Sequence, residues 1–61
     1  MKTKRVNELR VGDVFFDEGV EYRIESIQKQ GIYFSVWGRN VINESIKFFF
    51  PWSNKKLVTE P

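Results

Sequence analysis

Tight-turn signals at regular intervals are the feature that most narrows the folds open to this chain. Asp17-Glu18-Gly19, Lys29-Gln30-Gly31 and Gly38-Arg39-Asn40 each carry residues that favour a chain reversal. The segments beside these turns alternate apolar and polar residues, as in VEYRI and IYFSVW, which is the pattern of strands with one buried face. Turns roughly every 8–12 residues, without a helical period, are typical of all-β barrels and sandwiches. The spacing therefore predicts an all-β fold.

A fold of this size depends on side-chain packing. The 61 residues suffice for one domain, and such a domain buries only about 60% of the surface that its unfolded chain exposes. The chain has no cysteine and no histidine, which excludes disulfides and the usual zinc sites. Six Phe, two Tyr and two Trp offer large buried areas instead. We expect one domain over residues 1–61, with residues 1–5 as a flexible basic tail.

The segment after the first turn contains a break in its alternation. Val20, Tyr22 and Ile24 share one face of a predicted strand. Ile27 lies an odd number of residues from Ile24, so both side chains reach the core only if the strand bulges or bends near Ser26. Such a bend lets a small sheet curl over itself.

A later strand is predicted over residues 41–50, and its two faces differ in apolar content. The more apolar face is expected to point inward and consists of Ile42, Glu44, Ile46, Phe48 and Phe50. Phe49 is then expected on the outer face. Pro51 cannot donate a ladder hydrogen bond and ends this strand. A short 3₁₀ turn and a last strand over residues 57–59 are expected to follow.

The opening of the chain resembles the first hairpin of Src-homology-3-like small barrels. Leu9-x-x-Gly12-Asp13 precedes one strand, Asp17-x-Gly19 follows it, and the next strand carries Tyr22 among alternating apolar residues. Short bacterial and phage proteins and the KOW-type modules of ribosomal and elongation factors share this shape. The resemblance implies a five-stranded barrel over nearly the whole chain and, loosely, a binding role. It supplies no functional residue, because the KOW signature cannot be matched here residue by residue.

The residue content argues against catalysis. Histidine and cysteine, which supply the commonest general bases and nucleophiles, are absent. The four glycines are spaced as hairpin turns and do not form a phosphate-binding loop. Asp17 and Glu18 lie in a predicted turn, and the remaining carboxylates of the first half alternate with arginine on an outward face. We therefore expect a non-enzymatic protein with no catalytic, metal-binding or cofactor-binding residues and no cofactor.

Aromatic and basic residues form the candidate binding surface. Tyr33 and Trp37 face outward on a predicted strand whose inward residues are Ile32, Phe34 and Val36. A hairpin with the strand over residues 41–50 would place further outward residues beside them. The candidate macromolecule-binding set is Tyr33, Trp37, Arg39, Lys47, Phe49, Trp52, Lys55 and Lys56. Aromatic rings among lysines and arginines are typical of single-stranded nucleic-acid binding, because bases stack on the rings and cations contact phosphates.

Charge supports an anionic partner only in part, and two other interpretations stay open. The net charge is +2, with acidic residues concentrated over residues 8–28 and basic ones on both sides of that segment. Nucleic acid is the first expectation. Protein binding or homodimerisation is the alternative, as in a phage-encoded inhibitor of a host protein, since interfaces favour the same residues. The aromatic residues could also form a second core.

The expected setting is the cytoplasm of a bacterial or phage-type system. The chain contains no apolar run long enough for a membrane span. Its basic start, MKTKR, precedes VNELRVGDV, which is too polar for a signal peptide. No membrane partner and no small-molecule cofactor are expected.

Overall fold

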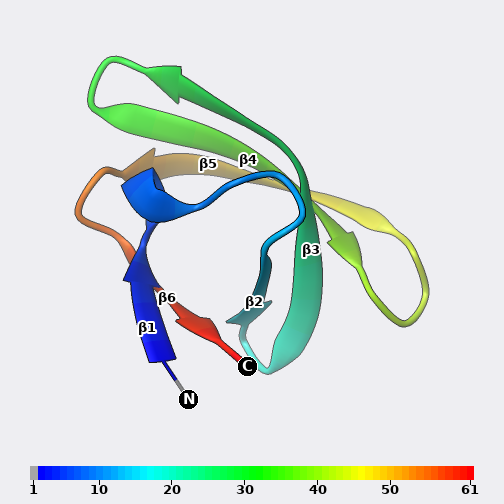
Figure 1. Cartoon of the computed structure of the whole chain (residues 1–61). Helices are drawn as coiled ribbons and strands as arrows, with labels where there is room; N and C mark the ends of the chain where they lie inside the picture. Colours follow the sequence, from blue (N-terminus) through cyan, green and yellow to red (C-terminus); the bar gives the residue numbers. More distant parts are fainter. Residues whose placement is uncertain (1) are drawn as a thin grey trace.

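The described part of the chain forms one antiparallel sheet of six strands (Figure 1). A computed structural model describes residues 2–61. The strands are β1 (Lys2–Arg5), β2 (Val14–Asp17), β3 (Val20–Gln30), β4 (Tyr33–Asn40), β5 (Ile46–Ser53) and β6 (Leu57–Glu60). Their order in the sheet is β1-β6-β2-β3-β4-β5. The all-β prediction is confirmed, but the sheet has six strands and is not closed into a barrel, so the five-stranded barrel is not confirmed.

The segment expected to be a flexible tail is instead an edge strand. β1 pairs with β6 from Lys2 opposite Glu60 to Arg5 opposite Leu57. The Lys4 ammonium lies 3.8 Å from the Glu60 carboxylate, so the basic segment finds an acidic neighbour. The tail prediction is therefore wrong for residues 2–5, while Met1 lies outside the described residues.

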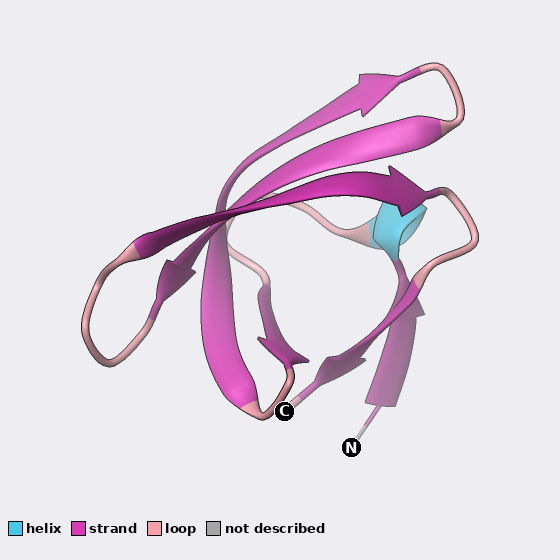
Figure 2. Cartoon of the chain, turned by 180° about the vertical axis from the view of Figure 1, so that it is seen from behind, coloured by secondary structure: helices cyan, strands magenta, loops and turns pink. Residues whose placement is uncertain are grey.

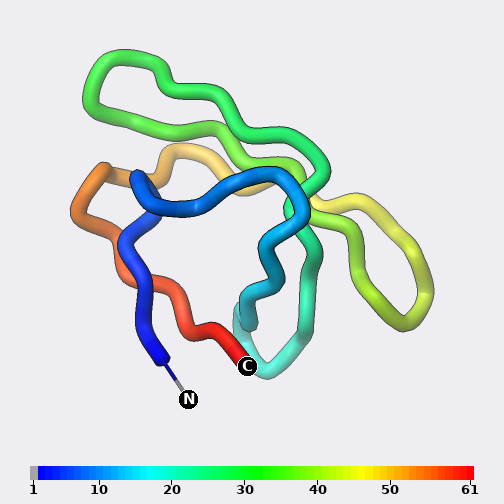
Figure 3. Tube along the Cα trace, in the orientation of Figure 1, coloured from blue at the N-terminus to red at the C-terminus, as the bar shows by residue number. Residues whose placement is uncertain are grey.

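The β1–β6 pair joins the other four strands through a narrow seam. A single residue pair, Phe16 opposite Thr59, links β2 to β6. Because Lys2 pairs with Glu60, the start of β1 and the end of β6 lie near each other (Figure 2). The β3–β4 turn and the β4–β5 loop extend from opposite ends of the molecule (Figure 3).

Local turn chemistry explains the first hairpin. Glu18 and Gly19 have φ of 50° and 79°. Two successive positive φ values are typical of a type I′ turn, whose twist matches that of the two strands it joins. The predicted break in β3 is also present, because the β3–β4 register shifts between Ile24 and Ser26. This bulge lets Ile24 and Ile27 both face the core, as expected.

A 3₁₀ helix is present near the start of the chain and not before the last strand. A 3₁₀ helix covers Val6–Glu8, and its start is placed by the Val6 N–H, which donates to the Lys56 carbonyl at 2.9 Å. The connection before β6 is a tight turn in which the Lys56 N–H bonds to the Ser53 carbonyl at 2.9 Å. The expected 3₁₀ turn at this connection is therefore wrong.

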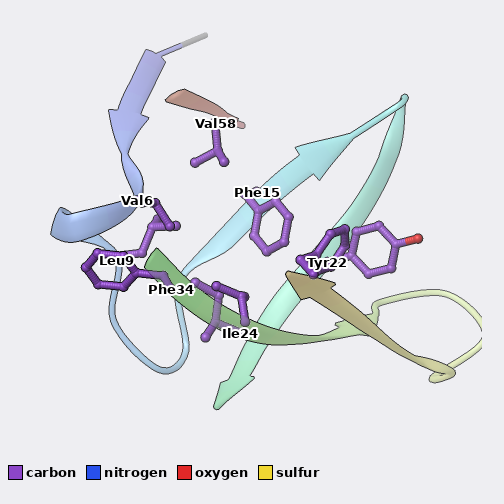
Figure 4. Close-up of a cluster of buried hydrophobic side chains, with 9 residues drawn as sticks. Val6, Leu9, Phe15, Tyr22, Ile24, Phe34 and Val58 are labelled. Carbon is purple, nitrogen blue, oxygen red and sulfur yellow. The ribbon is translucent and has the colours of Figure 1, made fainter. Parts of the chain in front are cut away.

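Rings from β2, β3 and β5 fill the centre of the curled sheet, and aliphatic residues close its open side. The buried hydrophobic residues are Val6, Leu9, Phe15, Tyr22, Ile24, Phe34, Val36, Phe49 and Val58, most of them labelled in Figure 4. The Phe15 ring is fully buried and lies 5.5 Å from the Phe49 ring and 5.6 Å from the Trp52 ring, centroid to centroid. Side chains of β5 therefore pack against a side chain of β2, although the two strands are not neighbours in the sheet.

The predicted inward face of residues 41–50 is wrong. Val41 to Ser45 form a loop, because β4 continues through Gly38-Arg39-Asn40, the segment expected to turn. Ile42, Ile46, Phe48 and Phe50 are exposed, whereas Phe49 is buried.

Gly38 explains the choice of face. A Cβ atom on Gly38 would lie 3.2 Å from Cε2 of Phe49 and 3.1 Å from Cβ of Tyr22. The bare glycine backbone thus makes room for the ring of Phe49 on the inner face. Because side chains alternate along a strand, this placement turns Phe48 and Phe50 outward.

Candidate functional site

Three aromatic side chains lie side by side on the outer face of β4 and β5. Trp37, Phe48 and Phe50 are 42%, 47% and 49% exposed. The Trp37 and Phe48 ring centroids are 4.3 Å apart, and the Phe48 and Phe50 rings are nearly parallel at 6.0 Å. We call these three residues the aromatic row. Each ring of the row is partly exposed to solvent, and Phe48 lies between the other two rings.

The β4–β5 register brings the row together. Trp37 lies directly opposite Phe48, and Arg39 lies opposite Ile46. The Asn40 N–H donates to the Ser45 carbonyl at 2.8 Å, so alternation makes Trp37 and Phe48 a pair without mutual backbone hydrogen bonds. Side chains are closest in such pairs, which explains the short distance between the two rings.

Side-chain hydrogen bonds hold the loop that sets this register. The Asn40 carboxamide oxygen accepts the N–H groups of Ile42 at 2.8 Å and of Asn43 at 3.2 Å. The Asn43 carboxamide oxygen accepts the Ser45 hydroxyl at 2.7 Å. Asparagine is suited to such turns because its side chain satisfies the backbone two residues onward. The loop therefore has a defined shape, which fixes where β5 begins relative to β4.

Arg39 lies on the outer face, and its guanidinium group is bound to neighbouring groups of the same chain. Its Nε and Nη2 atoms each lie 3.0 Å from Oε1 of Glu25, and its Nη1 donates to the Glu44 carbonyl at 3.0 Å. Arg23 also lies 4.0 Å from the Glu25 carboxylate. The positive charge at this end of the row is thus partly neutralised, and every nitrogen of the Arg39 guanidinium has a partner.

Three members of the predicted binding set belong to the inner face or its rim. Phe49 is in the core, and the half-buried Trp52 packs against it with ring centroids 4.8 Å apart. The Lys47 ammonium lies 5.2 Å from the Phe49 ring and 3.4 Å from the Asp17 carboxylate. These residues do not join Trp37, so the predicted set divides between the two faces of the sheet.

The remaining predicted residues lie at one end of the row. Tyr33 is exposed at the start of β4, opposite Ser53. Lys55 and Lys56 are exposed in the turn after β5, and the Lys56 ammonium lies 5.4 Å from the Trp52 ring. The Asn54 N–H donates to the Ile32 carbonyl at 3.0 Å, which ties this turn to the β3–β4 turn. The structure therefore keeps Tyr33, Trp37 and Arg39 on one face, with two lysines beyond its end.

Sequence reasoning missed Phe48 and Phe50 as surface residues. Their stripe is more apolar than the stripe of Lys47 and Phe49, and apolar content alone favours its burial. The informative signal was Gly38, which follows Phe34 and Val36 at the same two-residue interval. A glycine on an inward stripe offers space for one ring of the neighbouring strand.

The part of the chain from residue 2 to 61 forms no pocket, and it includes no helix with the length and apolarity needed to cross a bilayer. Comparisons with protein-family models, with curated proteins and with solved structures found no match to this chain. The resemblance to Src-homology-3-like barrels therefore stays a prediction.

Proposed function

We propose that this chain is a non-catalytic protein-binding module whose contact surface is the aromatic row. The observation that carries the proposal is the joint exposure of Trp37, Phe48 and Phe50 at 42%, 47% and 49% on one sheet face. Aromatic residues are enriched in the buried centres of protein interfaces, where a few of them supply most of the binding energy. A cytoplasmic setting, expected from the absence of cysteine, is part of the proposal.

The ring geometry favours protein over nucleic acid as the partner. A base that stacks on an aromatic side chain needs a free ring face. In the row, one face of Phe48 is occupied by Trp37 at 4.3 Å, and its other neighbour Phe50 is nearly parallel to it. Phe48 therefore has a neighbouring ring on both sides, which restricts access to its faces, and aromatic edges pack well against aliphatic and aromatic side chains of a protein.

The placement of cations points the same way. Phosphate recognition uses lysines and arginines that are available beside the stacking rings. Arg39 is bound to Glu25 and to the Glu44 carbonyl, and Lys47 lies on the inner face beside Asp17. Apolar contact is thus the main interaction that the row offers.

A random-peptide selection tests the proposal. Peptides selected on the immobilised wild-type chain are then titrated against Phe48→Ser and against Ile42→Ser. Ile42 is 88% exposed in the β4–β5 loop, so Ile42→Ser removes an exposed apolar side chain outside the row. We expect Phe48→Ser to weaken binding at least about tenfold, as at an interface hot spot, and Ile42→Ser to leave it unchanged.

Two outcomes contradict the proposal. One is a selection that yields no peptides, or only peptides that bind the Phe48→Ser variant as well as the wild type. The other is binding of a mixed-sequence single-stranded oligonucleotide, measured by fluorescence anisotropy, that falls steeply with salt and depends on Lys55 and Lys56. That result would instead identify a nucleic-acid-binding protein.

A further inference from the structure

The two edges of the sheet differ in their protection against pairing with other chains. β1 is the charged segment Lys2–Arg5 at one edge, and charged side chains on an edge strand oppose further pairing. β5 lies at the other edge. Its outer stripe contains no charge and consists of Ile46, Phe48 and Phe50, which are 45%, 47% and 49% exposed. This edge carries none of the usual charged protection on its outer face.

We propose that β5 pairs antiparallel with β5 of a second copy of this chain, across a two-fold axis. The inference rests on the proposed function and deepens it, because it names a second copy of this chain as a partner of the aromatic row. In the dimer, two sheets would become one continuous sheet. The two aromatic rows would meet at the new strand pair, since both outer faces lie on the same side of the joined sheet.

Backbone groups at the free edge of β5 are placed for this pairing. The Asn40 N–H bonds to the Ser45 carbonyl, and alternation along the ladder makes Gly38–Lys47 and Val36–Phe49 the next hydrogen-bonded pairs. The N–H and C=O groups of Ile46 and Phe48 consequently point away from β4, toward the free edge. Pro51 has no N–H, so the pairing segment is limited to residues 46–50.

This segment is complementary to itself. With Phe48 opposite Phe48 of the second copy, the free-edge groups form a hydrogen-bonded pair, and Ile46 lies opposite Phe50 of the second copy. Lys47 then faces Phe49 of the second copy and not another lysine. Lys47 already lies 5.2 Å from the Phe49 ring of its own chain and 3.4 Å from the Asp17 carboxylate. No two like charges lie directly opposite each other in this register, so the strand pair avoids the most direct like-charge repulsion.

The size of the contact sets the concentrations to be examined. The chain exposes 4218 Å², and a stable interface covers about 800 Å² per partner. That area is about a fifth of the whole surface, which is more than a five-residue edge supplies. The dimer is therefore expected to form in the micromolar to millimolar range, typical of interfaces below the standard size.

Sedimentation equilibrium of the full chain, from about 10 μM to about 1 mM, measures the association. The variants Phe48→Lys and Phe48→Glu place like charges directly opposite each other at the two-fold axis, where they destabilise a strand pair. We expect each variant alone to associate at least about tenfold more weakly than the wild type, and an equimolar mixture of the two to recover association. As a control, far-UV circular dichroism tests whether both variants are folded.

A backbone variant separates strand pairing from general hydrophobic contact. The 61-residue chain is short enough for chemical synthesis with N-methylated Phe48, which removes one edge N–H and keeps every side chain. We expect this chain to stay monomeric. A wild-type chain that is monomeric at the highest concentration overturns the inference, as does association that survives in the N-methylated chain or is absent from the Lys–Glu mixture. If the wild type stays monomeric yet binds selected peptides through Phe48, only the dimer inference fails and the proposed function stands.

Discussion

Replacing each of the three consecutive phenylalanines with alanine tests the inverted face of β5. Phe49 is 6% exposed, and its ring lies 5.5 Å from Phe15, 5.3 Å from Tyr22 and 4.8 Å from Trp52. Removal of a buried phenylalanine ring costs about 3–5 kcal/mol. A 61-residue domain has about 3–9 kcal/mol of stability in total. Phe49→Ala therefore removes at least a third of the stability, and up to all of it.

The neighbouring substitutions are matched controls of the same chemistry. Phe48 and Phe50 are 47% and 49% exposed, so about half of the 1.5–3 kcal/mol gained by burying a phenylalanine applies to each. The expected cost of Phe48→Ala or Phe50→Ala is thus about 1 kcal/mol. Expressed as melting temperature, Phe49→Ala lowers Tm by roughly 12 °C or more, and each control lowers it by roughly 4–8 °C.

The assay is thermal and urea unfolding followed by circular dichroism, at a protein concentration low enough to keep the chain monomeric. The slope of the urea transition reports whether the variants unfold from equally compact states. If Phe48→Ala or Phe50→Ala costs as much as Phe49→Ala, then the inward stripe of β5 is the more apolar one after all. The argument from Gly38 and the definition of the aromatic row would both be refuted.

Two further substitutions test the packing at Gly38 and the role of β1. Gly38→Ala places a Cβ atom 3.2 Å from the Phe49 ring; we expect a loss of about 1 kcal/mol from overpacking, and a melting temperature above that of the wild type would contradict this. Lys4→Met removes ion pairs with Asp13 and Glu60 at 3.4 and 3.8 Å. We expect this substitution to lower the free energy of unfolding by about 0–1 kcal/mol at low salt. Urea unfolding in about 1 M NaCl should give a smaller difference, because salt screens the ion pairs.

Features that depend on neighbouring residues were predictable from the sequence. The Glu18-Gly19 turn follows from residues that tolerate positive φ. The bulge between Ile24 and Ser26 follows from two isoleucines that must share a face despite an odd spacing. The outward direction of Tyr33 and Trp37 follows from alternation with Phe34 and Val36, whereas their exposure of 43% and 42% decides against the second core that the sequence left open for them. In each case the information lies within a few residues of the feature.

The pairing of the chain ends was not predictable in the same way. β1 and β6 lie at opposite ends of the sequence and pair from Lys2–Glu60 to Arg5–Leu57. A run such as Lys2–Arg5 has no apolar stripe, so its pattern does not distinguish a strand from a tail. Its partner is determined by backbone hydrogen bonding and by charges at Asp13 and Glu60, which only the folded chain brings near.

β5 shows why local pattern fails where a strand serves two surfaces. Alternation determines which residues of β5 share a face, but it does not determine which of the two faces packs against the core. Here a single ring, Phe49, fills the space above Gly38, and one step of alternation leaves Phe48 and Phe50 in solvent.

An exposed apolar stripe lowers solubility and contributes less to folding than a buried one, so its presence needs another reason. Local patterns that disagree with the fold are expected at functional positions. The stripe whose burial was predicted wrongly is therefore the part of the chain for which a binding role offers the simplest physical explanation.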